Sequence, residues 1–171
     1  MYAVGSKVVH PYHGAGTIVR IQEKSIGDST NFYYVIDTVP SPREMRLMVP
    51  VDDAERVGLR RVGEASRLRE MLSVLTKHPS EDEVETDFRA RKATMTERLR
   101  SGQFAEVVKV VRELFAMSMH RSLGTTDRRF LEQGKEMLAG ELALAANIDR
   151  EEAMEEIEKK ALEMVPQGEK G

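Results

Sequence analysis

The spacing of apolar residues changes character once along the chain, near residue 60. Before that point, short runs rich in β-branched and aromatic residues alternate with polar positions, and glycine and proline separate the runs. This pattern is typical of β-strands. Short strands at this spacing predict a small β-barrel that leaves one sheet edge open. We expect strands over residues 4–9, 14–21, 32–36 and 44–50, with a polar hairpin tip at 25–31.

From about residue 62, apolar residues recur at intervals of three and four, as they do along one side of an α-helix. One such stripe runs from Leu68 to Leu75, and the helix that carries it must end before Pro79. Ser80 and Glu83 have the spacing of a capping box, which predicts the start of the next helix. We expect the remaining helices over residues 80–100, 104–115, 125–147 and 153–164.

The two patterns together predict an α+β protein, a small N-terminal β-barrel followed by a compact all-α helical bundle. The connecting helix between them can pack against either half. We expect the barrel over residues 1–60, the connecting helix over 61–79, the helical domain over 80–165 and a disordered tail over 166–171.

Composition narrows the function classes. The chain has 171 residues, of which 40% are hydrophobic, enough to form real cores. It contains no cysteine, which excludes disulfides, thiolate catalysis and cysteine-ligated metal sites. The N-terminus lacks the pattern of a signal peptide, and no apolar run is long enough to span a membrane. We therefore expect a cytoplasmic protein with no membrane association.

Charge is distributed unevenly although the formal net charge is only −3. Residues 88–135 hold eleven Lys/Arg against five Asp/Glu, whereas residues 81–87 hold five acids. One interpretation is that these surpluses are ordinary solvated helix faces. The other is that the basic segment contacts phosphates.

Motifs for catalysis are missing from the sequence. His10 and His13 have H-x-x-H spacing, but Pro11 places them in a turn with no third ligand nearby, so packing is the preferred interpretation over metal binding. Nucleotide-binding and hydrolase motifs are not found, and the carboxylates cluster in runs typical of solvated faces. We expect no enzyme activity, no cofactor, no metal and no small-molecule substrate.

The segment with the clearest binding character begins at Phe88, which is followed at once by Arg89, Arg91 and Lys92. An apolar ring beside closely spaced cations suits a protein that grips phosphates and presses a flat group against bases. The alternative is that Phe88 is a core residue at the start of a helix.

The chain resembles the CarD/CdnL family of bacterial RNA polymerase-binding transcription regulators over almost its whole length. The resemblance rests on the pattern G-x-x-V-V-x-P-x-H-G-A at residues 5–15, on Val49-Pro50, on residues 102–114 and on G-E-L-A-L-A at residues 140–145. It implies an SH3-like or Tudor-like barrel that binds the RNA polymerase β subunit. It also implies a helical domain that touches promoter DNA, weakly and within the polymerase complex, at the upstream edge of the bubble. Such a protein stabilises the open complex and resides with polymerase at the nucleoid.

The family's polymerase-binding residues carry over to the barrel unevenly. A basic residue of the second strand matches Lys24, while a second basic position falls on Met48, just before Val49 and Pro50. Arg46 lies two residues earlier, on the same face of a strand, and can supply the missing charge.

In the helical domain, the family's tryptophan wedge is replaced by Phe88. Arg91 matches a family arginine three residues after the wedge position. Arg128 and Arg129 match a basic pair in the third helix of the family's helical domain. Phenylalanine can fill a disrupted base step but cannot donate a hydrogen bond, so we expect a weaker wedge. The alternative function is a polymerase-binding interaction module whose helical half does not touch DNA.

Overall fold

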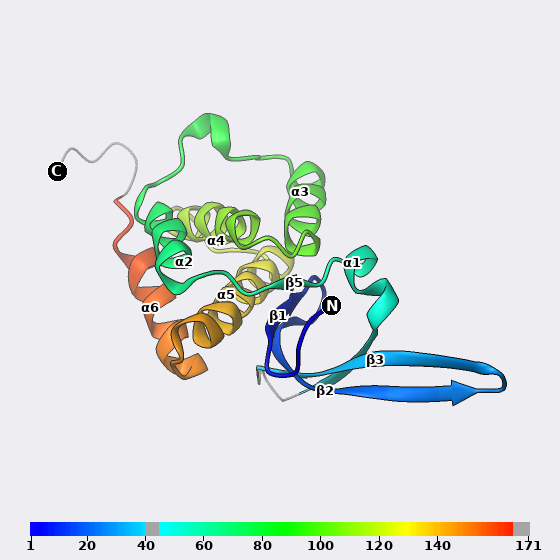
Figure 1. Cartoon of the computed structure of the whole chain (residues 1–171). Coiled ribbons are helices and arrows are strands. Elements are labelled where there is room, and N and C mark those ends of the chain that lie inside the picture. The colour runs from blue at the N-terminus through cyan, green and yellow to red at the C-terminus, as the bar shows by residue number, and fades with distance from the viewer. Residues whose placement is uncertain (40–44, 166–171) are drawn as a thin grey trace.

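The structure is a computed structural model, and it describes residues 1–39 and 45–165. A β-sheet and a group of helices lie side by side, and the sheet comes entirely from the first part of the chain (Figure 1). We refer to residues 1–63 as the sheet half and to residues 64–165 as the helical half. The predicted α+β class is confirmed. The predicted tail at 166–171 lies outside the described residues.

The sheet is antiparallel and five-stranded, in the order β4-β3-β2-β1-β5. The four predicted strands are confirmed, but the hairpin tip predicted at 25–31 is wrong, because β2 continues to Ile26 and β3 begins at Ser29. A fifth strand, of only two residues, was not predicted. Their bounds are β1 Lys7–His10, β2 Gly14–Ile26, β3 Ser29–Thr38, β4 Arg46–Pro50 and β5 Arg60–Arg61. Strands β2 and β3 form a long hairpin that projects away from the rest of the molecule (Figure 1).

The inner face of the sheet is apolar and forms a core of its own. Short helical segments, η1 Val51–Asp53 and α1 Ala54–Val57, connect β4 to β5 and close one end of this core. Its buried members alternate along the strands, as expected for a sheet with one solvated face. They are Val8, Ile18, Tyr34, Ile36, Val49, Ala54 and Leu59.

The helical half contains α2 Ala65–Leu72, η2 Ser73–Thr76, η3 Glu81–Glu83, α3 Phe88–Arg100, α4 Phe104–Ser118, α5 Thr125–Ala146 and α6 Arg150–Leu162. Among the described residues, none of these helices is long and apolar enough to cross a membrane. The connecting helix packs on this half, because Leu68, Leu72 and Leu75 are buried in its core. Asn147, in the left-handed conformation at φ 54°, ends α5 as predicted.

The helix predicted to begin at residue 80 was placed too early. The Ser80–Glu83 capping box exists, but it closes a single 3-10 turn, η3. The regular helix α3 begins only at Phe88, because the side chain of Asp87 accepts a hydrogen bond from the Ala90 backbone N–H at 3.0 Å. Phe88 is therefore the first residue of its helix.

Candidate functional site

Most of the predicted barrel residues lie on one face of the sheet. In the strand register, Tyr33 pairs with Gln22 and Pro50, and Asp37 pairs with Arg46. Directly paired residues point to the same side of a sheet, and side chains two apart on one strand do so as well. One solvent-facing surface therefore carries both predicted cations. We call it the outer sheet face, and it comprises Arg20, Gln22, Lys24, Tyr33, Asp37, Arg46, Met48 and Pro50.

Val49 was predicted as a polymerase contact, and its side chain is on the wrong side for that role. It is paired with Tyr34 and buried in the core of the sheet half. The alternation of a strand requires this, because its neighbours Met48 and Pro50 point to the opposite face. Val49 supports the outer sheet face from below.

Arg20 was not predicted, yet it shares a row of the outer sheet face with Met48, since both are in register with Val35. A β-bulge between Ile18 and Arg20 shifts the register. Ile18 is fully buried and Arg20 is exposed, although the two residues are only two apart. The bulge thus turns Arg20 and Lys24 outward. Arg20 supplies a cation in the row where Met48 lacks one.

Arg46 is exposed and forms a two-pronged ion pair with Asp37, at 2.7 Å from Nε to Oδ1 and 3.0 Å from Nη2 to Oδ2. Hydrogen bonds from Arg46 hold the pKa of the Asp37 carboxyl below its ordinary value. Lys24 lies 5.8 Å from the centre of the Tyr33 ring. The face therefore combines cations, an anion and apolar side chains.

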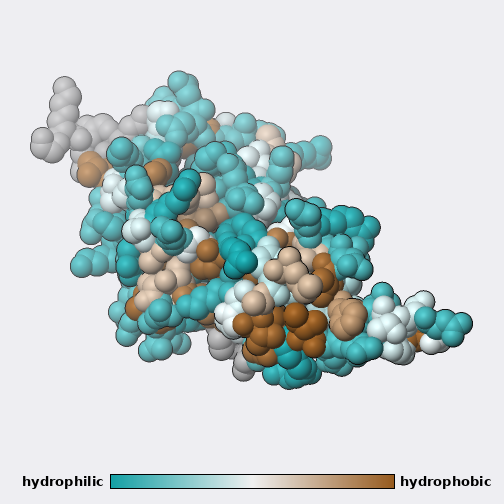
Figure 2. Space-filling model, viewed as in Figure 1, coloured by the Kyte–Doolittle hydropathy of each residue, from teal (hydrophilic) through white to brown (hydrophobic). Residues whose placement is uncertain are grey.

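Hydrophobic residues also gather on this half of the molecule. In the view of Figure 2, the largest hydrophobic cluster lies over the sheet half. Exposed apolar side chains of the sheet half include Met48 on the outer sheet face and Ile21 and Phe32 on the opposite side of the sheet. Exposed apolar groups rimmed by polar ones are typical of protein-binding surfaces.

Phe88 is 47% exposed at the first position of α3. Its ring lies 5.6 Å from the guanidinium of Arg91, measured from the ring centre to Cζ. The interpretation of Phe88 as a buried core residue is therefore wrong. The ring rests on the protein on one side and is accessible on the other.

Arg91 was predicted to contact DNA, and the structure corrects this. Its side chain is 4% exposed and forms a two-pronged ion pair with Asp127, at 2.9 and 3.0 Å. It also donates hydrogen bonds to the backbone carbonyls of Glu85 and Thr86. All of these bonds lie inside the helical half, so Arg91 is a support for Phe88 and for the segment before α3.

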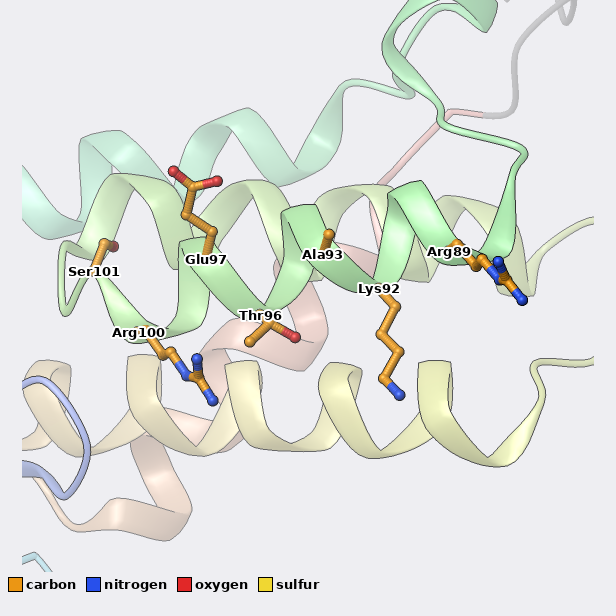
Figure 3. Close-up of a pocket in the computed structure, with 7 residues that line it drawn as sticks. All are labelled: Arg89, Lys92, Ala93, Thr96, Glu97, Arg100 and Ser101. Atoms are coloured by element: carbon orange, nitrogen blue, oxygen red, sulfur yellow. The ribbon is translucent and has the colours of Figure 1, made fainter.

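The solvent side of α3 carries a row of cations. Arg89, Lys92, Thr96 and Arg100 follow each other at intervals of three or four residues and line a shallow groove. Figure 3 shows Lys92, Thr96 and Arg100 extending from one side of the helix and Glu97 from the opposite side. We call this row the exposed side of α3. Arg100 was not among the predicted residues, although its helical spacing from Arg89 is visible in the sequence.

The predicted pair Arg128 and Arg129 lies in the first turns of α5, and both residues are exposed. Arg128 donates a hydrogen bond to the Leu123 carbonyl at 3.1 Å, which ties it to the loop before the helix. Arg129 lies 5.9 Å from the centre of the Phe130 ring. The pair therefore belongs to a second helix beside α3.

The acidic segment before α3 is partly neutralised inside the protein. Glu83 forms an ion pair with Arg112 at 2.7 Å, and this bond lowers the pKa of the Glu83 carboxyl. Asp87 caps α3, and Glu85 accepts the backbone N–H of Asp87. Part of the negative charge of the segment is therefore paired or used for capping, although all five acids remain exposed.

In the histidine pair of the first turn, His10 is half-buried and His13 is exposed. The rings of His10 and His13 are 4.8 Å apart, and His10 Nδ1 accepts the Tyr12 backbone N–H at 3.1 Å. Burial, and secondarily the charge of His13, lowers the pKa of His10. Within the described residues, no three histidine or acidic side chains come together as metal ligands.

Comparison with known proteins finds the same family for both halves. Residues 2–63 match the family model described as "CarD-like/TRCF RID domain", and residues 70–158 match "CarD, C-terminal domain". The chain is also similar to the "Putative transcription factor YdeB" of Bacillus subtilis (strain 168). The two are 28% identical over 148 residues, which cover 86% of this chain and 94% of the relative.

Proposed function

This chain belongs to the CarD family of transcription factors, and on that basis we propose that it binds the RNA polymerase β subunit and stabilises the promoter open complex. The outer sheet face binds the β subunit. The exposed side of α3, with Phe88 at its tip, contacts DNA at the upstream edge of the bubble. The RID-type domain links the sheet half to RNA polymerase.

The observation that carries the DNA-facing role is the exposure of Phe88 at the end of a cationic helix. An aromatic ring can fill a gap at an unstacked base step but finds no such gap in intact duplex DNA. Arg89, Lys92 and Arg100 supply contacts to phosphates on either form. Only the ring therefore discriminates between the open and the closed complex, and only discrimination shifts their equilibrium.

The sheet half explains how so modest a basic surface is sufficient. Once the outer sheet face is bound to polymerase, the helical half acts on nearby DNA at high effective concentration. The chain as a whole carries a net charge of −3, which disfavours strong binding to free DNA. Specific action at polymerase-bound promoters follows from this combination.

The experiment measures the lifetime of open complexes after addition of a polyanionic competitor. We expect Phe88→Ala to shorten the lifetime about tenfold, equivalent to about 1.4 kcal/mol. Phe88→Trp should lengthen it, because a larger ring covers more of the base step. Leu162→Ala, which truncates an exposed apolar side chain on α6, is the matched control. An unchanged lifetime with Phe88→Ala, at unchanged polymerase affinity, would refute the wedge.

A second candidate function is an interaction module whose helical half binds protein and not DNA. Two observations favour it. Arg91 is turned inward, and Glu81 and Asp82 are exposed close to Phe88 in the sequence. The dependence of promoter-complex stability on salt separates the two functions, because phosphate contacts release counterions and protein contacts of this kind do not.

A further inference from the structure

We infer that a junction of five residues, Pro11, Arg60, Gly102, Gly140 and Glu141, fixes the direction in which α3 points from the polymerase-bound sheet half. Pro11, Gly102, Gly140 and Glu141 come from the motifs at the first turn, before α4 and within α5, and Arg60 lies in β5. Neither proposed interface uses these residues. The inference rests on the proposed function for its purpose, but the rigidity that it predicts can be measured without polymerase.

In the first contact of the junction, Pro11 packs directly against Gly58 and Gly102. Pro11 is buried, and a Cβ atom added at Gly58 would lie 2.9 Å from Pro11 Cγ. A Cβ atom added at Gly102 would lie 3.0 Å from Pro11 Cα. Both glycines have positive φ, at 90° and 68°, so other residues would be strained there as well. The turn of the sheet half thus contacts the backbone of the α3–α4 turn directly.

The second contact is an ion pair that crosses between the halves. Arg60 Nη1 and Nη2 donate to the two carboxylate oxygens of Glu141, at 2.9 and 2.6 Å. Arg60 Nε and Nη2 also donate to the Gly102 carbonyl, at 3.0 and 2.7 Å. The Glu141 carboxylate accepts the Gly63 backbone N–H at 2.9 Å and is 3% exposed. Three segments therefore meet at one arginine.

The third contact brings a helix against a strand. A Cβ atom added at Gly140 of α5 would lie 3.8 Å from the Cβ atom of Ala15 in β2. Farther along, Lys7 Nζ donates to the Leu144 carbonyl at 2.8 Å and to Asn147 Oδ1 at 2.7 Å. The C-terminal part of α5 is thus held at several points between Gly140 and Asn147, which blocks rotation of the halves about Arg60 alone.

Gly102 lies at the end of α3 far from Phe88, so a small rotation at the junction moves Phe88 by a larger distance. Gly102 follows the C-terminal end of α3, whereas Phe88 is at the other end, about 20 Å away at about 1.5 Å per residue. A rotation of about 10° at the base would move Phe88 by about 3 Å, about the height of one base step. A buried ion pair adds little net stability but can specify one arrangement over others. Arg60 and Glu141 are therefore positioning residues for Phe88.

The direct test measures a distance between the halves in the full chain. Because the chain has no cysteine, Glu55→Cys and Ser122→Cys introduce the only two sites for spin labels, one on each half. We expect one narrow distance distribution in the parent and a broader or shifted one with Arg60→Met or Glu141→Gln. Glu141→Gln keeps the shape of the side chain, which keeps the test valid should Arg60→Met unfold.

The matched controls are Arg69→Met and Glu156→Gln. They break a similar two-pronged pair, at 2.7 and 3.2 Å, that lies entirely within the helical half. These variants should leave the distribution narrow. If the distribution stays as narrow in Arg60→Met and Glu141→Gln as in the controls, the junction does not fix the halves and the inference fails.

A second test restores rigidity by a covalent bond. Cysteines at positions 15 and 140 would place their Cβ atoms about 3.8 Å apart, the usual spacing in disulfides. In Arg60→Met we expect loss of the lengthened open-complex lifetime with polymerase affinity retained. Oxidation of Ala15→Cys/Gly140→Cys in that background should recover the lifetime, and reduction should abolish it again.

The two tests distinguish a failure of the proposed function from a failure of the inference about the junction. If the parent protein does not lengthen open-complex lifetime at all, the proposed function fails, while the label distances still decide whether the junction is rigid. If the parent lengthens the lifetime and the oxidised variant does not recover it, loss of positioning is not what Arg60→Met causes, and the inference is overturned.

Discussion

The outer sheet face and the exposed side of α3 both present cations, but they differ in how those charges are balanced. On the sheet, one of the three cations, Arg46, is paired with Asp37, Lys24 lies against the Tyr33 ring, and Met48 adds an apolar contact. On α3, Arg89, Lys92 and Arg100 have no ion pair with any of the described residues. A surface of mixed charge and apolar groups favours a protein partner, whereas uncompensated cations in a row favour phosphates. This difference supports the partner that we propose for each surface.

The largest effect is expected from Arg91→Met. Unlike the exposed cations of α3, this arginine is buried and stabilises the helix from inside. The variant leaves the Asp127 carboxylate buried without its partner, at a cost of about 3–5 kcal/mol in the free energy of unfolding. Urea unfolding measures this loss. Arg69→Met, which breaks the more exposed pair with Glu156, should cost less than about 1 kcal/mol. Equal losses in the two variants would indicate that Arg91 is exposed to solvent, like the other cations of α3.

Charge reversal on the outer sheet face comes next. Arg20→Glu combined with Lys24→Glu should weaken binding to core polymerase at least about tenfold, because acids then replace two cations of the proposed interface. Equilibrium binding of the full chain measures this. Arg67→Glu with Lys159→Glu reverses two exposed cations of the helical half and serves as the control. Retained binding after the reversal on the sheet would mean that polymerase uses another surface.

A smaller effect separates phosphate contacts from protein contacts at α3. Lys92→Gln and Arg100→Gln should each reduce the slope of log stability against log salt by about one, for promoter complexes that contain the protein. Lys159→Gln on α6 should leave the slope unchanged. If the slopes with Lys92→Gln and Arg100→Gln equal that of the parent, the exposed side of α3 does not bind DNA and the interaction-module function gains.

The smallest effect concerns the first turn, which contacts the turn between α3 and α4. Burial lowers the pKa of His10 from 6.5, so the folded state binds fewer protons than the unfolded state. The contribution of His10 to stability is therefore complete above pH 6.5 and declines as the pH falls through 6.5 towards the folded-state pKa. His10→Asn should make the free energy of unfolding less dependent on pH over this range. An NMR titration of the His10 ring that gives a pKa above 6.5 would contradict it.

Regular patterns made the overall fold predictable. Alternation located four strands, and Asn147 and the capping box were recognised from local chemistry alone. Strand β5 escaped because it is only two residues long and is defined by its pairing with β1. The bulge between Ile18 and Arg20 depends on the partner strand as well, so the direction of Arg20 could not be predicted from alternation.

The site was less predictable than the fold, for two different reasons. Arg91 is in line with Met95 and Leu99, both buried, at intervals of four residues, so the helical period already contained the signal that it faces inward. Its partner Asp127 is 36 residues away and carries no such signal. Likewise, the pairing of Arg60 with Glu141 spans 81 residues and becomes visible only when the two halves are placed together.

The central claim is that Phe88, carried by a polymerase-bound protein, prefers separated strands to paired ones. The most direct measurement is a competition between an upstream fork-junction DNA and a fully paired DNA of the same sequence for polymerase holding this protein. We predict that the protein increases the preference for the fork junction and that Phe88→Ala removes the increase. An equal gain for both DNAs, or a gain that survives Phe88→Ala, would contradict the account.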